Sequence, residues 1–178
     1  MGASLASRVP MPTFLHSARA PFVIAALTSF GLVFGGVAMA HFMNLAACPL
    51  CIIQRMLYLL LGTLAVIGIA LAARRLGRSV ALLMVATAGT GIFVAGYQVW
   101  LQRFARDTKC AVDTPWWERL VDWAGQQVPL FFQPNGLCSD AAWKFLGLSI
   151  AEWSLMAFSF LLALSLFAAF RRADGRFS

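Results

Sequence analysis

The sequence predicts an all-α membrane protein built as a bundle of four transmembrane helices. Of its 178 residues, 61% are hydrophobic and 12% are charged, whereas soluble domains are about 45–50% apolar and about 25% charged. The mean hydropathy is +0.78. Four stretches reach or approach the ~20 apolar residues that a helix needs to cross a bilayer: about residues 21–41, 50–72, 80–100 and 153–170. Since short links favour antiparallel neighbours, we expect an up-down-up-down bundle that forms one integral membrane domain over residues 1–178.

The first span resembles a secretory signal peptide in part, because Arg19 precedes an apolar run that ends in "AMA" at residues 38–40. The run from 22 to 40 has 19 residues, longer than the ~7–15 of a signal core. We therefore expect an uncleaved span; cleavage, the alternative, would leave the orientation of the later spans unchanged.

Glycines occur at close spacing in the first and third spans. Small residues let membrane helices approach closely, so we expect these glycines to pack the bundle. They are Gly31, Gly35 and Gly36 in the first span and Gly89, Gly91 and Gly96 in the third.

The net charge of +7 is distributed as in a membrane protein and does not predict nucleic-acid binding. Arginines are in excess before the first span, between spans two and three, and after the fourth: Arg8, Arg19, Arg74, Arg75, Arg78, Arg171, Arg172 and Arg176. The long link, counted over residues 101–150, has five bases and five acids. Excess arginine marks the cytoplasmic side, so both termini are expected in the cytoplasm. The loops at about 42–49 and 101–152, with all four cysteines, are expected outside, in an oxidising compartment such as a bacterial periplasm.

The long outer loop contains the segment "DTPWWERLVDWAGQQVP", residues 113–129. Asp113 and Thr114 are candidate helix caps, and Pro115 suits a first turn. An apolar face with tryptophans lies opposite a charged face, which predicts a short amphipathic helix. It either lies at the bilayer interface or folds onto the end of the bundle.

Two cysteines of the stretch "ACPLCIIQR" lie at the mouth of the second span. Pro49 suits the first turn of a helix, so we expect this helix to begin near Cys48 and to carry Cys51 in its first turn. A helix N-terminus and a nearby arginine both stabilise a thiolate, and Arg55 follows Cys51 by four residues on the same face. Cys51 is therefore a candidate for a stabilised thiolate at the membrane.

Arg55 is costly inside an apolar span, by ~2.5–3.5 kcal/mol at a helix centre and less near an interface. It either snorkels to the outer surface or holds a polar group at membrane depth, such as a thiolate or the carbonyl of a lipid-soluble cofactor. Its place one turn from a dithiol favours the second hypothesis.

The cysteine spacing argues against a metal site. Cys110 and Cys138 are 28 positions apart, not the two to four typical of zinc ligands. Covalent haem needs Cys-x-x-Cys-His, and Ile52 follows Cys51 here. Structural disulfides remain an alternative, although a Cys-x-x-Cys ring closes very little chain and is better suited to redox exchange.

Three motifs resemble the bacterial disulfide bond formation protein B (DsbB) family. They are "CPLCIIQR" at 48–55, "VWLQ" at 99–102 and "CSDAAWKFLGLSIAEW" at 138–153, in the family's order and spacing and with the loop cysteine pair. The resemblance implies an enzyme of a Gram-negative inner membrane that reoxidises the periplasmic thiol oxidase DsbA. It passes the electrons to ubiquinone or menaquinone, and thereby to the respiratory chain.

The resemblance also implies roles for individual residues. Cys110 resembles the loop cysteine attacked by DsbA, and Cys138 resembles its disulfide partner, which exchanges onto Cys48. That exchange releases Cys51, the partner of Cys48, as a thiolate beside the quinone, where Arg55 assists.

The sequence departs from the family at two positions. Gln98 stands where many members have histidine, and it can donate a hydrogen bond to a quinone oxygen but cannot carry a proton. Ala151 replaces a proline at the start of the fourth span.

Three alternatives stay open. One is a related enzyme that serves a different periplasmic thiol protein, and another is a quinone-linked reductase resembling the vitamin K epoxide reductase group. In that group the helix-borne Cys-x-x-Cys follows the loop pair, whereas here it precedes the pair. The third is a membrane scaffold with structural disulfides and no enzymatic activity.

Overall fold

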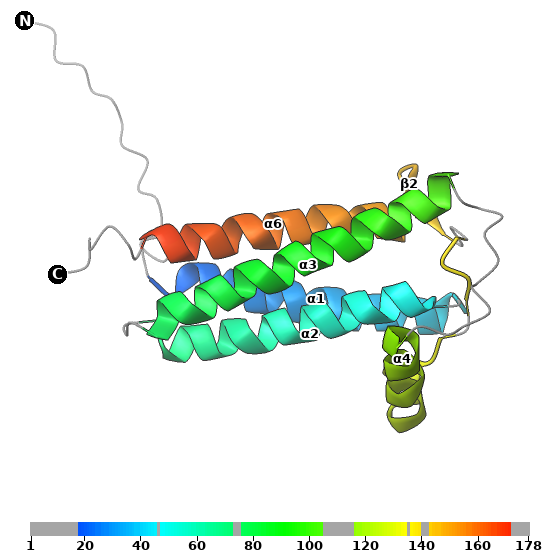
Figure 1. Cartoon of the computed structure of the whole chain (residues 1–178), viewed down its shortest axis with the longest axis horizontal. Helices are drawn as coiled ribbons and strands as arrows, with labels where there is room; N and C mark the ends of the chain where they lie inside the picture. Colours follow the sequence, from blue (N-terminus) through cyan, green and yellow to red (C-terminus); the bar gives the residue numbers. More distant parts are fainter. Residues whose placement is uncertain are drawn as a thin grey trace, which may run out of the picture.

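Four long helices lie side by side and form the body of the protein (Figure 1). The computed structural model describes residues 18–45, 47–72, 76–104, 116–134, 136–139 and 143–171. The long helices are α1 (Ala20–Phe42), α2 (Pro49–Ala70), α3 (Leu76–Phe104) and α6 (Ile150–Arg171). Each is long and apolar enough to cross a membrane, and successive ones run in opposite directions (Figure 1). The predicted four-helix, up-down-up-down bundle is confirmed.

Two helices extend beyond the predicted spans. The third begins at Leu76 and ends at Phe104, and the fourth begins at Ile150, whereas hydropathy predicted 80–100 and 153–170. Hydropathy locates only the part of a helix that lies in hydrocarbon, while backbone hydrogen bonding continues into polar residues at each end. The sequence also carries a start signal for α6 that the prediction missed. Ser149 precedes the helix, and its hydroxyl and the Glu152 carboxylate each accept the other residue's backbone N–H, which is a capping box.

The core of the bundle is formed by small residues that face large ones. A Cβ atom added at Gly91 of α3 would lie 2.3 Å from the ring of Phe158, and one at Gly68 of α2 would lie 2.2 Å from Phe22. Phe158 stacks on Tyr58, with ring centroids 4.1 Å apart. These close approaches join α3 to α6, α2 to α1 and α2 to α6.

Most of the glycines expected to pack the bundle do not do so. Of the six, Gly91 alone would bring a Cβ within 4 Å of a neighbour. The others are Gly31, Gly35, Gly36, Gly89 and Gly96. The prediction was wrong for these five because spacing along a helix identifies a small-residue face but not the direction in which that face points.

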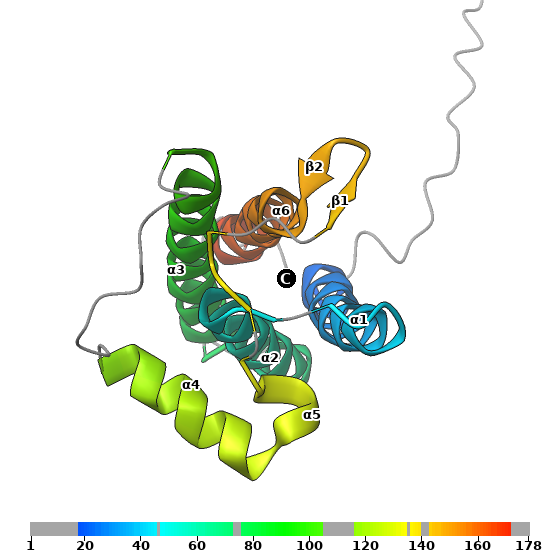
Figure 2. The same cartoon turned by 90° about the vertical axis from the view of Figure 1, so that its right-hand side faces the viewer.

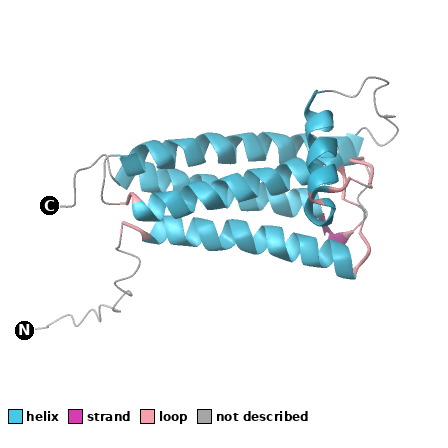
Figure 3. Cartoon of the chain, turned by 90° about the horizontal axis from the view of Figure 1, so that it is seen from below, coloured by secondary structure: helices cyan, strands magenta, loops and turns pink. Residues whose placement is uncertain are grey.

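The remaining elements gather at the end of the bundle where α2 begins, which we call the cysteine end (Figures 1 and 2). They are α4 (Trp116–Gln127), α5 (Pro129–Phe132) and a hairpin of β1 (Lys144–Phe145) and β2 (Leu148–Ser149). Seen in Figure 3, α4 crosses the long helices instead of running along them. Figure 2 shows α4 and α5 beside α2, and the hairpin beside α6.

Helix α4 occupies the segment in which the sequence predicts a short amphipathic helix. Val121 is fully buried and Ala124 is nearly so, and Gly125 approaches the backbone carbonyl of Phe132 in α5. On other faces of α4, Trp116 and Trp123 are exposed. The helix therefore packs on its neighbours through small residues and leaves these two indole rings uncovered.

Candidate active site

The first two cysteines lie at the start of α2, as the sequence predicts. Cys48 is the N-cap residue in an extended conformation, Pro49 follows in the first turn, and the Cys51 backbone N–H donates to the Cys48 sulfur over 3.3 Å. The two sulfur atoms are 2.9 Å apart. Cys48 is buried, with 3% exposed, whereas Cys51 is partly exposed. Of the two residues, Cys51 is therefore the more exposed.

The loop that contains Cys138 folds back onto the same helix start. The backbone N–H of Gly136 donates to the carbonyl of Ala47 over 3.1 Å. Cys138 is hydrogen-bonded to the Cys48 thiol, and its sulfur accepts the backbone N–H of Leu50 in the first turn of α2. Cys138, Cys48 and Cys51 thus form a chain of contacts at the start of α2, with Cys48 in the middle, and all three are free thiols. Cys110 lies outside the described residues.

The contacts between the sulfurs shift the pKa values of Cys138 and Cys48 in opposite directions. The hydrogen bond from Cys48 is the largest cause that holds the pKa of the Cys138 thiol below its ordinary value, and the Leu50 N–H contributes in the same direction. Hydrogen bonds to Cys138 and Cys51, with burial, raise the pKa of the Cys48 thiol. With all three cysteines reduced, Cys138 is thus favoured to carry the negative charge and Cys48 to keep its proton. Of the two donors to Cys138, only the Leu50 N–H would remain if Cys48 were in a disulfide, because a disulfide sulfur has no proton to donate.

Gln98 of α3 lies against the first two cysteines. Its side-chain N–H groups donate to the Cys51 sulfur over 3.1 Å and to the Cys48 sulfur over 3.3 Å. Its oxygen accepts a hydrogen bond of 2.8 Å from Gln54 of α2. In the structure, Gln98 is therefore a donor to sulfur. The use of its amide for a quinone oxygen, predicted from the sequence, stays a prediction.

Arg55 is half-buried one turn beyond Cys51, and its guanidinium donates to the backbone carbonyl of Phe131 in α5 over 2.9 Å. The Phe131 ring packs against the hydrophobic core and makes an edge contact with Phe34 of α1, with ring centroids 6.4 Å apart. A guanidinium has five N–H donors, and this hydrogen bond uses one of them.

Comparisons with known proteins identify the family. Residues 18–168 match the family described as "Disulfide bond formation protein DsbB". The chain belongs to the DsbB family. A disulfide bond formation protein B of Dechloromonas aromatica is 38% identical over 164 residues, which cover 89% of this chain and 92% of that protein. Proteins of the same name from Albidiferax ferrireducens and Marinobacter nauticus are each 33% identical and cover 92% and 87% of this chain, and 94% of their own lengths.

Family membership and the four apolar helices identify a multi-pass membrane protein and a disulfide oxidoreductase of the DsbB type. In the part of the chain that the structure describes, no group of three or more His, Cys, Asp or Glu side chains is placed to hold a metal ion. Among the described residues, the candidate site brings together the sulfur atoms of three cysteines, the side-chain amides of Gln54 and Gln98, and the guanidinium of Arg55 one turn further along α2.

Sequence reasoning missed two contributors to the site. Gln54 is a polar side chain inside an apolar span, and that alone is a signal of function in membrane helices. The contact of Arg55 with Phe131 left no signal, because the acceptor is a backbone carbonyl and every residue has one.

Proposed function

We propose that the protein reoxidises a DsbA-like thiol oxidase at the periplasmic face of a Gram-negative inner membrane and delivers the electrons to ubiquinone or menaquinone. The observation that carries the proposal is the uninterrupted contact from Cys138 to Cys48 and from Cys48 to Cys51 at the start of one membrane helix. Cys48 thereby contacts both the loop cysteine, Cys138, and the cysteine in the first turn of the membrane helix, Cys51.

The proposed cycle uses two disulfides, Cys110–Cys138 and Cys48–Cys51. A thiolate of the partner attacks Cys110, forms a mixed disulfide and releases Cys138 as a thiolate. Cys138 then attacks Cys48, which forms the Cys48–Cys138 bond and breaks the bond to Cys51. The partner's second thiol displaces Cys110 and leaves with its own disulfide. Each step exchanges one sulfur–sulfur bond for another, as thiol–disulfide exchange requires.

Cys51 and Cys110 are then reduced, and the electrons are expected to leave through the membrane from the Cys51 thiolate. Cys51 has Gln98 as a donor to its sulfur, and Arg55 lies one turn further along α2. These residues would hold the negative charge of the thiolate and the carbonyl oxygen of the acceptor, respectively.

Cys110 would then attack Cys138, which re-forms the Cys110–Cys138 disulfide and releases Cys48, so that Cys48 and Cys51 are both reduced. A quinone, when bound, would supply the two-electron oxidant that turns this pair back into the Cys48–Cys51 disulfide, and would take up the two electrons and two protons as quinol.

The proposed orientation places both termini in the cytoplasm and the cysteines in the periplasm. In support, the start of α1 and the end of α6 lie at the end of the bundle opposite the cysteines (Figure 1). In the sequence, the arginine excess precedes α1, separates α2 from α3 and follows α6.

The test mixes purified protein, a reduced DsbA-type oxidase and a soluble quinone, and follows quinone absorbance. We expect turnover by the wild-type chain and none by Cys48→Ser or Cys51→Ser. Ser159→Ala serves as the control, because it removes only an exposed hydroxyl that bonds to its own helix. Full turnover by Cys51→Ser overturns the proposal.

The same assay addresses the alternatives. Oxidation of a different periplasmic thiol protein, with DsbA-type oxidases inert, identifies an enzyme for another partner. A scaffold gives no quinone reduction with any partner, and its disulfides resist a glutathione redox buffer.

A further inference from the structure

The side-chain amide of Gln98 is held from both ends. Its oxygen accepts from Gln54 over 2.8 Å, and its nitrogen donates to the sulfurs of Cys51 and Cys48. Gln98 is 2% exposed and Gln54 is 4% exposed, so solvent does not compete for these hydrogen bonds. The two residues come from adjacent helices, α2 and α3, and are 44 positions apart in the chain.

An amide can face the sulfurs with either its nitrogen or its oxygen, and the two orientations differ chemically. When the nitrogen faces them, two N–H groups point toward sulfur. When the oxygen faces them, a thiolate meets an acceptor of like polarity. In the structure, the N–H of Gln54 faces the Gln98 oxygen. This contact favours the first orientation, because a turn of the Gln98 amide alone would bring two N–H groups together, and the Gln54 amide would have to turn as well.

We propose that Gln54 is a positioning residue that orients the Gln98 amide, so that both of its N–H groups donate to the Cys48–Cys51 pair. The inference rests on the proposed function of this pair as a redox centre. Gln54 itself acts only through Gln98.

This arrangement biases the redox equilibrium of the pair. Hydrogen bonds to a charged acceptor are stronger than those to a neutral one, and a thiolate accepts more strongly than a disulfide sulfur. Correctly oriented donors therefore stabilise the reduced form, so the disulfide is a stronger oxidant than it is without them. Such a bias favours electron flow from the loop cysteines to the membrane-level pair.

The test measures this equilibrium without quinone or partner. The full-length chain with Cys110→Ser and Cys138→Ser is equilibrated in detergent with glutathione buffers, and the Cys48–Cys51 state is read by differential alkylation. The reaction is the disulfide plus two glutathione thiols, giving the dithiol plus glutathione disulfide. We expect Gln54→Leu and Gln98→Leu each to shift this equilibrium toward the disulfide by about tenfold, equivalent to ~30 mV for two electrons.

Two further variants distinguish orientation from packing. The Gln54→Leu, Gln98→Leu double variant shifts the equilibrium no further than Gln98→Leu alone, because Gln54 has no other route to the sulfurs. Tyr58→Phe is the matched control: it removes a buried hydrogen bond to Ser154 from the next turn of α2, and the equilibrium stays at the wild-type value.

Gln54→Glu tests the orientation with nearly unchanged shape, including where Gln54→Leu does not fold. An ionised carboxylate cannot donate to Gln98 and attracts its N–H groups, so the amide turns and the equilibrium shifts as in Gln54→Leu. A protonated carboxyl group donates again, and burial raises the pH at which protonation occurs. The ratio of variant to wild-type equilibrium constants therefore returns toward one as pH falls.

Three results overturn the inference: a wild-type equilibrium in Gln54→Leu, additive shifts in the double variant, or a pH-independent ratio for Gln54→Glu. Because the measurement contains neither quinone nor partner, it is separate from the test of the proposed function. If the chain fails to reduce quinone but shows these shifts, the proposed function is wrong and the role of Gln54 stands.

Discussion

The guanidinium of Arg55 donates a hydrogen bond of 2.9 Å to the backbone carbonyl of Phe131. This contact joins a transmembrane helix to the short helix α5 of the long loop across 76 positions of sequence. It explains how an arginine is accommodated near the start of an apolar span, because a buried donor needs an acceptor. It also places the loop beside the residue expected to assist the quinone.

Arg55→Ala is expected to raise the apparent KM for quinone by about tenfold, since hydrogen bonds from charged groups contribute ~1.5–3 kcal/mol. Arg55→Lys keeps the charge without the planar fork of donors, and an intermediate effect is expected. Steady-state kinetics at varied quinone concentration measure both. Arg103→Ala, at the exposed end of α3, is the control. A quinone dependence identical to wild type would instead assign Arg55 to snorkelling.

Cys138 is expected to react as a thiolate at lower pH than an ordinary cysteine, whose pKa is about 8.5. Its pKa is lowered by the hydrogen bond from Cys48 and by the Leu50 N–H. A lower pKa increases the thiolate fraction below pH ~8.5, so alkylation begins at lower pH. The measurement is the iodoacetamide rate of the Cys138 peptide against pH, by mass spectrometry, in reduced Cys110→Ser protein. In protein that also carries Cys48→Ala, the alkylation profile is expected to move to higher pH, because the hydrogen bond from Cys48 is lost. An unchanged profile would contradict the role of Cys48 in lowering the pKa of Cys138.

Gly91→Ala is expected to destabilise the bundle by about 1–3 kcal/mol, as overpacking does in well-packed cores. The added methyl group would lie 2.3 Å from the Phe158 ring, and that ring is stacked on Tyr58 and cannot easily move. Gly96→Ala on the same helix meets nothing within 4 Å and is the matched control. Thermal unfolding in detergent compares the two, and equal midpoints would contradict the predicted overpacking against Phe158.

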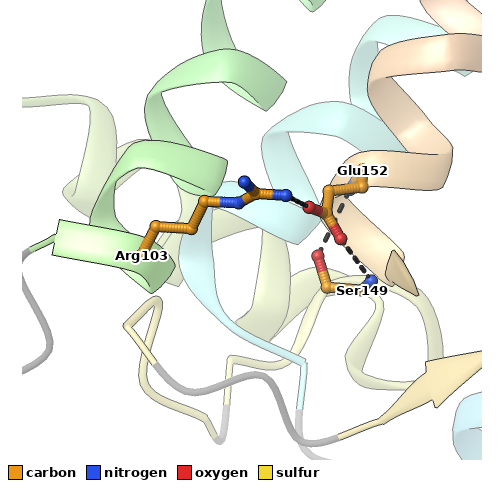
Figure 4. A network of polar contacts seen from close by, with 3 residues as sticks. All are labelled: Arg103, Ser149 and Glu152. Atoms are coloured by element: carbon orange, nitrogen blue, oxygen red, sulfur yellow. Dashed lines mark hydrogen bonds and ion pairs between the residues drawn. The ribbon is translucent and has the colours of Figure 1, made fainter. Parts of the chain in front are cut away.

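Glu152→Ala is expected to loosen the start of α6 more than Arg103→Ala does. Glu152 accepts from the Ser149 backbone and pairs with Arg103 (Figure 4). The alanine variant therefore loses both contacts. The Arg103 side chain is 61% exposed, and an exposed ion pair contributes only ~0–1 kcal/mol. Hydrogen exchange of the peptide at 143–153 measures the difference, and equal exchange in both variants would mean that the capping box contributes nothing.

Much of the fold follows from short-range information. The four spans are visible in hydropathy, since crossing a bilayer requires a long apolar run whatever its neighbours are. The start of α2 directly after Cys48 follows from Pro49, whose ring suits a first turn. The capping box at Ser149 and Glu152 was equally local and could have located the start of α6.

The rotation of each helix about its own axis could not be predicted from the sequence in this way. Glycine spacing in α1 and α3 correctly identified small residues, but Gly31 and Gly96 face open space and Gly91 faces Phe158. An apolar helix has weak asymmetry between its faces, so hydropathy does not indicate which face meets a neighbour.

By itself, the sequence determined the number of the membrane helices and their alternating direction, because each apolar run is local. It also placed Cys48, Cys51 and Arg55 at the start of α2 and within its first two turns. The tertiary structure alone decided that Cys138 contacts Cys48, that Arg55 bonds to Phe131, and that Gln54 holds Gln98 against the sulfurs. Each of these contacts joins distant segments, and its formation depends on how the helices rotate about their axes and how the loop closes over their ends.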